Sequence, residues 1–328
     1  MNSEIQSLTN LAKESADILM PLEQEIQQVI SGQKHILERL LIALIADGHV
    51  LLEGVPGIAK TLMIKTLAKC IDSAFCRIQF TPDLLPADIT GTKIFNQQDC
   101  TFTTVKGPVF TQFLLADEIN RAPPKVQSAL LEAMQERQVT IQGETYPLPD
   151  PFFVLATENP IEQEGTYPLP EAQTDRFMFK VLMGYPSKSE ELVILDRFTE
   201  GNLYAPRKVI AVAEIKKIQA VVPRIYADIE VKKYVTTLVD ATRNPGDYRI
   251  PLAPYIRFGA SPRASIYLIL GAKAHALIRG RGFVLPDDVK AVAHDVLRHR
   301  ILLSYLAEAE NITVDMIIDQ IIKSVPVP

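Results

Sequence analysis

The chain has 328 residues, of which 47% are hydrophobic, and a formal net charge of −5. This length is comfortable for two domains, and the apolar content excludes a largely disordered chain. The acidic balance also argues against a protein whose main partner is a nucleic-acid backbone, because such binding depends on Lys and Arg neutralising phosphates.

The N-terminus carries acidic residues early and has no apolar core of a signal peptide. The most apolar helical stretch, residues 36–46, is interrupted by Glu38 and Arg39 and is too short to span a bilayer. The cysteines lack the CxxC spacing of a metal or redox site. We therefore expect a soluble, cytoplasmic protein with no membrane span.

The first part of the chain alternates short apolar runs with helical patterns, which predicts a parallel sheet built from βαβ units. We assign residues 1–186 to this α/β domain. Two β-hairpins interrupt the alternation as inserts, near residues 91–107 and 137–148. The predicted strands are residues 49–54, 74–80, 113–118, 152–159 and 178–184.

Helices replace strands after residue 186. Ser261-Pro262 has the residue types of a helix start, and the helix is predicted to run to about residue 278. We therefore assign residues 187–328 to a smaller, all-α second domain.

The first strand runs directly into a loop and a predicted helix, residues 60–70. This context is typical of a phosphate-binding (Walker A) loop, in which backbone N–H groups and the helix N-terminus face phosphate. Lys60 would reach the β- and γ-phosphates, and the Thr61 hydroxyl would ligate Mg²⁺. An ordinary strand-to-helix turn is the alternative. The loop reads Gly54, Val55, Pro56, Gly57, Ile58, Ala59, Lys60, Thr61 and is followed by Leu62.

Ala59 departs from the general pattern, which has glycine before the lysine. A methyl group is tolerated there only if the backbone φ angle is negative. We therefore expect a negative φ at Ala59.

The third predicted strand ends in two carboxylates, Asp117 and Glu118. In a P-loop ATPase the aspartate at this strand end holds Mg²⁺, and the neighbouring glutamate can act as general base for the attacking water. A strand tip ending in acids is otherwise an ordinary solvated loop. The pair follows the phosphate-binding loop at a suitable separation, which favours the ATPase interpretation.

Three polar residues further along are also candidates. Asn159 ends the fourth strand, at the edge where ligands bind, and could orient the attacking water; it could also simply begin a turn before Pro160. Arg176 would lie at the domain rim and could act on a nucleotide in trans, or pair with Asp175 on a solvated face. Arg263 lies in the first turn of a helix, where a cation needs an anionic partner such as a γ-phosphate, unless it extends into solvent.

Several long stretches together resemble the MoxR branch of the AAA+ ATPases. The branch has alanine where other P-loops have glycine, as in GVPGIAKT. The other similar stretches are RIQFTPDLLPADITG, LLADEINRAPPKVQSALLEAMQERQVT, ATENPIEQEGTYPLPEAQTDRF, GASPRAS and GRGFVLPDDV. The resemblance covers about residues 25–305.

The resemblance implies roles for individual residues. Lys60 and Thr61 match Walker A, and Asp117 and Glu118 match Walker B. Asn159 matches sensor 1, Arg176 the arginine finger and Arg263 sensor 2. Arg121 lies in a similar rim position to Arg176 and is the alternative finger, and Gln33 matches the segment that lines the adenine pocket.

The resemblance also implies an αβα core with strand order 5-1-4-3-2, a helical lid, ATP and Mg²⁺ as cofactors, and assembly into a hexameric ring. The function implied is chaperone-like remodelling, maturation or activation of partner proteins, typically with a von Willebrand factor A-domain protein. A metal-chelatase ATPase subunit is the first alternative. A nucleic-acid motor is the second, and the first hairpin tip, residues 96–99, argues against it because it carries no cation.

Overall fold

The computed structural model describes residues 2–55, 57–160, 165–201 and 204–328. Within these ranges, five strands form one parallel sheet in the order β2-β5-β8-β1-β9. Counted along the chain, this is the predicted order 5-1-4-3-2, and each strand end lies within one residue of its prediction. The strands are β1 (Val50–Gly54), β2 (Phe75–Gln79), β5 (Phe113–Asp117), β8 (Phe153–Glu158) and β9 (Phe179–Met183).

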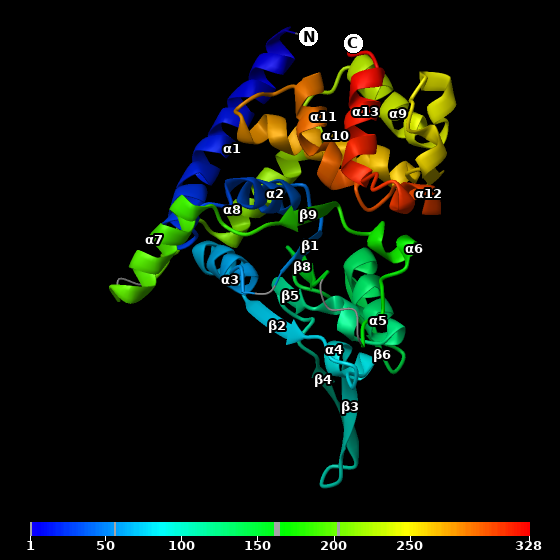
Figure 1. Ribbon diagram of the computed structural model, residues 1–328. Helices are drawn as coiled ribbons and strands as arrows, with labels where there is room; N and C mark the ends of the chain where they lie inside the picture. Colours follow the sequence, from blue (N-terminus) through cyan, green and yellow to red (C-terminus); the bar gives the residue numbers. More distant parts are fainter. Residues whose placement is uncertain (1, 56, 161–164, 202–203) are drawn as a thin grey trace.

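Helices cover both faces of the sheet, because successive side chains of its strands enter two different apolar clusters. In β1, Val50 and Leu52 belong to one cluster and Leu51 to the other. Residues of α1, α2 and α3 complete the first cluster, and residues of α4 and α5 complete the second. The αβα core is therefore confirmed (Figure 1). These helices are α1 (Asn2–Val29), α2 (Lys34–Ile45), α3 (Lys60–Ile71), α4 (Pro86–Thr90) and α5 (Pro124–Glu136).

The sequence analysis did not predict α1, a helix of 28 residues that runs along the side of the molecule (Figure 1). Ala12, Leu19, Leu22 and Ile26 are buried along it, and α1 packs against α3 and against α10 of the second half. Their spacings of seven, three and four residues keep them on one helical face. That spacing is the signal by which the helix could have been found.

Both predicted hairpins are present. β3 (Gly91–Asn96) pairs with β4 (Thr101–Lys106), and β6 (Gln138–Ile141) pairs with β7 (Glu144–Pro147). The β3–β4 hairpin projects well beyond the body of the molecule (Figure 1). Its base is attached to the second hairpin by an ion pair between Lys93 and Glu144, with 2.8 Å between Nζ and Oε1.

The second half of the chain is largely helical, as predicted. Ser261 begins α10 as predicted, because its hydroxyl accepts a hydrogen bond from the Arg263 N–H. A short ribbon, β10 (Ile256–Phe258) with β11 (Leu302–Leu303), was not predicted. The longer helices are α7 (Lys188–Thr199), α8 (Val212–Val221), α9 (Ile229–Arg243), α10 (Pro262–Ile278), α11 (Pro286–Leu297) and α13 (Val314–Ser324); α6 (Glu171–Thr174) and α12 (Tyr305–Ala309) are short.

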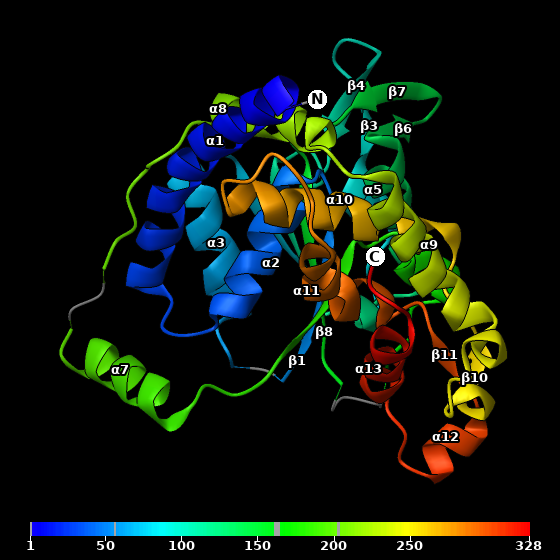
Figure 2. The same cartoon turned by 90° about the horizontal axis from the view of Figure 1, so that it is seen from above.

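The helical half packs on the face of the sheet that α2 covers, and one apolar cluster runs from the sheet into helices α9, α10 and α11. Helix α7 differs from the other long helices: none of its twelve residues is buried, and it stands apart from the body (Figure 2). The division of the chain at residue 186 stays a prediction. In the part of the chain that the structure describes, no helix is long and apolar enough to cross a membrane.

Candidate active site

The loop after β1 and the end of β5 meet at one cavity of about 410 Å³. Most predicted site residues share this cavity, because the carboxyl ends of parallel strands lie at one edge of the sheet. Gly54 and Val55 do not line it, and Pro56 lies outside the described residues. The lining residues are Gly57, Ile58, Ala59, Lys60, Thr61, Leu62, Arg77, Asp117, Glu118 and Asn159.

The loop is shaped by close packing at Gly54. A Cβ atom on Gly54 would lie 2.6 Å from the Met183 carbonyl oxygen, so β9 can approach the loop only where the side chain is absent. The Gly54 carbonyl in turn accepts a hydrogen bond from Lys60 Nζ at 2.5 Å. Burial lowers the pKa of Lys60, while Asp117 and Glu118 act in the opposite direction. The loop therefore holds a half-buried cation at the same cavity as two carboxylates.

The expectation for Ala59 was wrong. Its φ is 66° and its ψ is 24°, which is the left-handed region, and Gly57 before it also has a positive φ of 82°. The loop curls tightly before α3 begins at Lys60, and this curl requires the left-handed conformation whichever residue occupies the position. The alanine methyl group is therefore accommodated with backbone strain of about 1 kcal/mol.

The two carboxylates at the end of β5 are held by neighbours from β2. Arg77 donates from Nε and Nη2 to Asp117 Oδ2, at 3.0 and 2.7 Å. Gln79 donates from Nε2 to Glu118 Oε2 at 2.7 Å, and Arg121 pairs with the same oxygen at 3.0 Å. The sequence analysis missed Arg77 and Gln79, which lie on an ordinary-looking strand; only pairing of β2 with β5 brings them to the acids.

Thr61 and Asp117 fit a magnesium ion. No group of three or more His, Cys, Asp or Glu side chains in the described part of the chain could hold a metal. Mg²⁺ needs only one or two protein oxygen ligands, because water and substrate phosphates supply the rest. A hydroxyl and a carboxylate facing one cavity meet this requirement, and Thr157 fixes the carboxylate by donating to Asp117 Oδ1 at 2.7 Å.

A second, more apolar cavity of about 470 Å³ adjoins the first, and both are lined by Gly57, Ile58, Ala59 and Leu62. Gln33, predicted from the resemblance, lines it and donates from Nε2 to the Gly184 carbonyl at 3.2 Å. Val29 and Ile30, just before Gln33 in the same segment, line it as well. The walls from distant segments were not predicted from the sequence, and they include Met183, Tyr185, Ile194 and Phe198. A flat, apolar base would fit this cavity while its phosphates reach the first.

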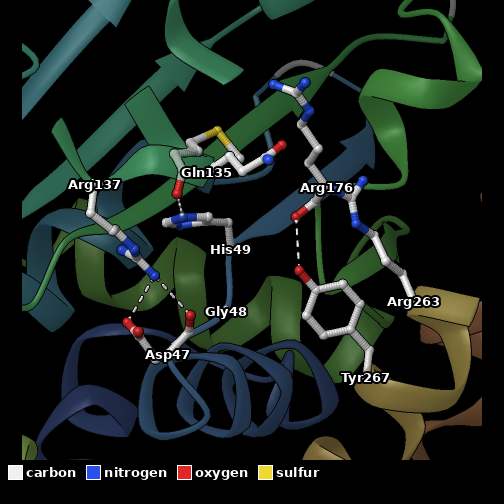
Figure 3. Close-up of a pocket in the computed structure, with 9 residues that line it drawn as sticks. Asp47, Gly48, His49, Gln135, Arg137, Arg176, Arg263 and Tyr267 are labelled. Atoms are coloured by element: carbon white, nitrogen blue, oxygen red, sulfur yellow. Dashed lines mark hydrogen bonds and ion pairs between the residues drawn. The ribbon is translucent and has the colours of Figure 1, made fainter. Parts of the chain in front are cut away.

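Arg176 and Arg263 line a different cavity, of about 210 Å³ (Figure 3). Asp47, Gly48 and His49, which precede β1, line it too, so it lies at the amino end of that strand. Figure 3 shows the two arginines and Tyr267 on one side of the cavity and Arg137 with Asp47 on the other.

The two arginines therefore lie far from the phosphate-binding loop of their own chain. Six residues of extended chain separate His49 from Val55, which is roughly 20 Å at a rise of about 3.3 Å per residue. An arginine side chain is much shorter than this separation. Within its own chain, Arg263 instead approaches Asp175, with 3.5 Å between Nη1 and Oδ2.

Two family models match the chain. The model of the ATPase family associated with various cellular activities (AAA) matches residues 49–179, and a model of the AAA lid domain matches residues 252–321. These matches include the loop, the acidic pair and the two arginines.

Among the relatives is the chaperone MoxR1 of Mycobacterium tuberculosis, 48% identical over 93% of this chain and 81% of its own length. The protein MoxR of Paracoccus denitrificans is 33% identical over 93% of this chain and 95% of its own length. The crystal structure of a candidate ATPase from Cytophaga hutchinsonii superimposes with a TM-score of 0.92, at 49% identity, over 99% of both chains.

Proposed function

Because this chain belongs to the MoxR family of AAA+ ATPases, a family of chaperone-like ATPases, we propose that it hydrolyses ATP in a Mg²⁺-dependent reaction and uses the energy to remodel, mature or activate a partner protein. The observation that carries the proposal is the shared cavity of Lys60, Thr61, Asp117, Glu118 and Asn159. A cation, a hydroxyl, two carboxylates and an amide at one helix N-terminus are the groups that phosphoryl transfer needs.

Each residue has one task in the proposed reaction. Lys60 binds the β- and γ-phosphates, and Glu118 takes a proton from the attacking water while Asn159 orients that water. Thr61 and Asp117 hold Mg²⁺, which neutralises charge on the phosphate oxygens. Gln33 and the apolar cavity beside the loop hold the adenine base.

Arg176 and Arg263 act on the nucleotide of a neighbouring subunit in this proposal. Their cavity lies at the end of β1 opposite the loop of their own chain. In a ring with head-to-tail contacts, that surface of one subunit faces the loop of the next. AAA+ ATPases usually form rings, and we propose a hexamer. The arginine cations would then stabilise charge on the transferring phosphoryl group.

The proposed client is a protein, with a von Willebrand factor A-domain protein as the partner. The net charge is −5, and the tip of the β3–β4 hairpin carries no cation. Phe95 and Phe102 pair across that hairpin and are 48% and 67% exposed. Exposed apolar side chains on a projecting element favour protein contact over phosphate contact. The cytoplasmic location stays a prediction.

Two substitutions test the reaction. Lys60→Ala should abolish ATP binding, because it removes the cation that faces the phosphates. Glu118→Gln should bind ATP as the wild type does but hydrolyse it far more slowly, because only the base is lost. Titration with a fluorescent nucleotide and an assay of phosphate release separate the two effects. Normal turnover by Glu118→Gln would exclude Glu118 as the base.

A second assay tests the client. ATPase activity should not rise with single- or double-stranded DNA at physiological salt, and a von Willebrand-type partner should bind more tightly when ATP and Mg²⁺ are present. Several-fold stimulation by DNA, with none by a candidate protein partner, would favour the nucleic-acid motor instead. A metal-chelatase subunit would require a chelatase partner for stimulation.

A further inference from the structure

Among the contacts between the helical half and the core, several meet at Asp175 and Arg176. Ser261 Oγ donates to both carboxylate oxygens of Asp175, at 3.0 and 2.9 Å. Tyr267 donates from its hydroxyl to the Arg176 carbonyl at 3.3 Å, as Figure 3 shows. Arg263 and Arg300 also approach Asp175. Four side chains from the helical half therefore converge on the segment that carries the proposed trans-acting arginine.

Arg300 makes the most extensive of these contacts. Its side chain is 1% exposed, and its Nε donates to Asp175 Oδ1 at 2.7 Å. Nη2 donates to the carbonyls of Asp175 and Phe177, at 2.8 and 2.7 Å, and Nη1 donates to the carbonyl of Met178 at 3.3 Å. A buried guanidinium is stable only where its N–H donors have hydrogen-bond partners. Most of the donors of Arg300 bond to backbone carbonyls on both sides of Arg176.

Arg176 depends on this backbone for its orientation. Its Nε is buried and has no hydrogen-bond partner among the described residues, so that nitrogen does not anchor the side chain. Asp175, the nearest carboxylate in sequence, is instead held by Arg300 and Ser261. The carbonyls on both sides of Arg176, which Arg300 holds, therefore contribute to the direction in which this side chain leaves the backbone.

We infer that Arg300 is a positioning residue for Arg176: it fixes the backbone around Arg176 so that this arginine can reach the nucleotide of the neighbouring subunit. The inference rests on the proposed function, in which Arg176 acts in trans. Since Arg263 and Tyr267 lie on α10 of the same helical half, a movement of this half would shift both arginines together. The helical half of one subunit would thereby control hydrolysis in the next.

The test separates positioning from mere stabilisation. Arg300→Lys keeps the charge next to Asp175 but cannot reach all the carbonyls, because an ammonium lacks the planar fork of donors. It should bind ATP with unchanged affinity and lose between about tenfold and a hundredfold in turnover, as expected for a misplaced catalytic group. Arg298→Lys is the matched control, because Arg298 also joins the helical half to the core but does so at the Lys180 carbonyl on β9, while it pairs with Asp295 inside the helical half. Its turnover should stay near that of the wild type.

Mixed rings give the readout that a structural role would not produce. Arg300→Lys subunits keep an intact phosphate-binding loop, and Lys60→Ala subunits keep intact arginines. A 1:1 mixture should therefore regain about one quarter of the wild-type sites, if subunits mix at random around the ring. A mixture of Arg300→Lys with Arg176→Ala should show no recovery above the residual turnover of Arg300→Lys, because both subunits lack a competent trans-acting arginine.

Three results would overturn the inference. The first is wild-type turnover by Arg300→Lys alone. The second is that Arg300→Lys gains no turnover when mixed with Lys60→Ala, although Arg176→Ala does gain turnover when mixed with Lys60→Ala. That result would place the defect of Arg300→Lys in its own nucleotide site or in its fold. The third is failure of Arg176→Ala itself to recover in demonstrably mixed rings, which would refute the trans role in the proposed function. If Arg300→Lys does not assemble into rings, Tyr267→Phe is the substitute, because it removes only the hydroxyl bond to the Arg176 carbonyl. Tyr267→Phe should lose less turnover than Arg300→Lys and should recover in mixed rings with Lys60→Ala. Wild-type turnover by Tyr267→Phe, or no recovery in mixed rings, would count against the inference.

Discussion

Gln79 restrains the carboxylate that we propose as the general base. Its Nε2 donates to Glu118 Oε2 at 2.7 Å. A hydrogen bond to a charged group contributes about 1.5–3 kcal/mol. The ion pair between Arg121 and the same oxygen is partly exposed and contributes less, about 0.2–1 kcal/mol. We propose that Glu118 gives up the Gln79 bond when that oxygen accepts a proton from water.

Gln79→Ala should therefore raise the basal rate of ATP hydrolysis. If about 1.5 kcal/mol of the barrier is the release of Glu118, removing the bond speeds turnover about tenfold. The measurement is steady-state phosphate release at saturating ATP and Mg²⁺, without a partner protein. Gln219→Ala is the control, because it removes a hydrogen bond of similar length, to the Leu44 carbonyl, away from the site. A loss of turnover in Gln79→Ala would instead show that Gln79 orients Glu118 productively.

Three further predictions concern the loop, acid stability and the hairpin. Ala59→Gly should raise the free energy of unfolding by up to about 1 kcal/mol, because it removes the strain of the left-handed conformation. Gly57→Ala, whose new Cβ meets no atom within 4 Å, should lower the free energy of unfolding by a similar amount. Thermal unfolding without nucleotide compares the two variants, and a lower stability of Ala59→Gly would show that Ala59 is not strained. Although burial raises the pKa of Asp288, hydrogen bonds from Arg281 and His275 lower it from 3.8 to about 2. The ionised Asp288 therefore stabilises the fold above about pH 4, and this stabilisation is lost as the pH falls towards 2. Asp288→Asn should reduce the change in the free energy of unfolding between about pH 4 and pH 2, measured by urea unfolding. An unchanged pH dependence would exclude Asp288 as the cause of that change. Replacing Phe95 and Phe102 by serine should lower the rate of ATP hydrolysis measured with the partner protein and leave the rate without it unchanged. An equal decrease of both rates would exclude a docking role for the two phenylalanines.

The sheet and its site were predictable because their signals are local. Each apolar strand, the loop from Gly54 to Thr61 and the acids at the end of β5 are contiguous in sequence, and parallel strands bring their ends together. The role of Ser261 at the start of α10 was predictable for the same reason. Gln33 was predicted only from the resemblance to the family, because composition and spacing alone did not indicate it.

What could not be predicted depends on packing between distant segments. Gln79 reaches Glu118 only because β2 pairs with β5, and Arg300 reaches Asp175 across 125 residues of chain. Neither has a motif. The φ angle of Ala59 was predicted wrongly because the requirement of the loop for a left-handed residue outweighs the intrinsic preference of alanine. Residues that support a site are thus harder to find than the residues that form it.

We propose that each active site is built from two subunits, and complementation between two inactive variants tests this arrangement. Arg176→Ala and Lys60→Ala should each be inactive alone, the first because it supplies no arginine and the second because it binds no ATP. Mixed 1:1 in rings shown to exchange subunits, they should recover about one quarter of the wild-type rate of phosphate release, since that share of interfaces joins an intact loop to an intact arginine. No recovery in such rings would exclude Arg176 as the trans-acting arginine and make Arg121 the next candidate.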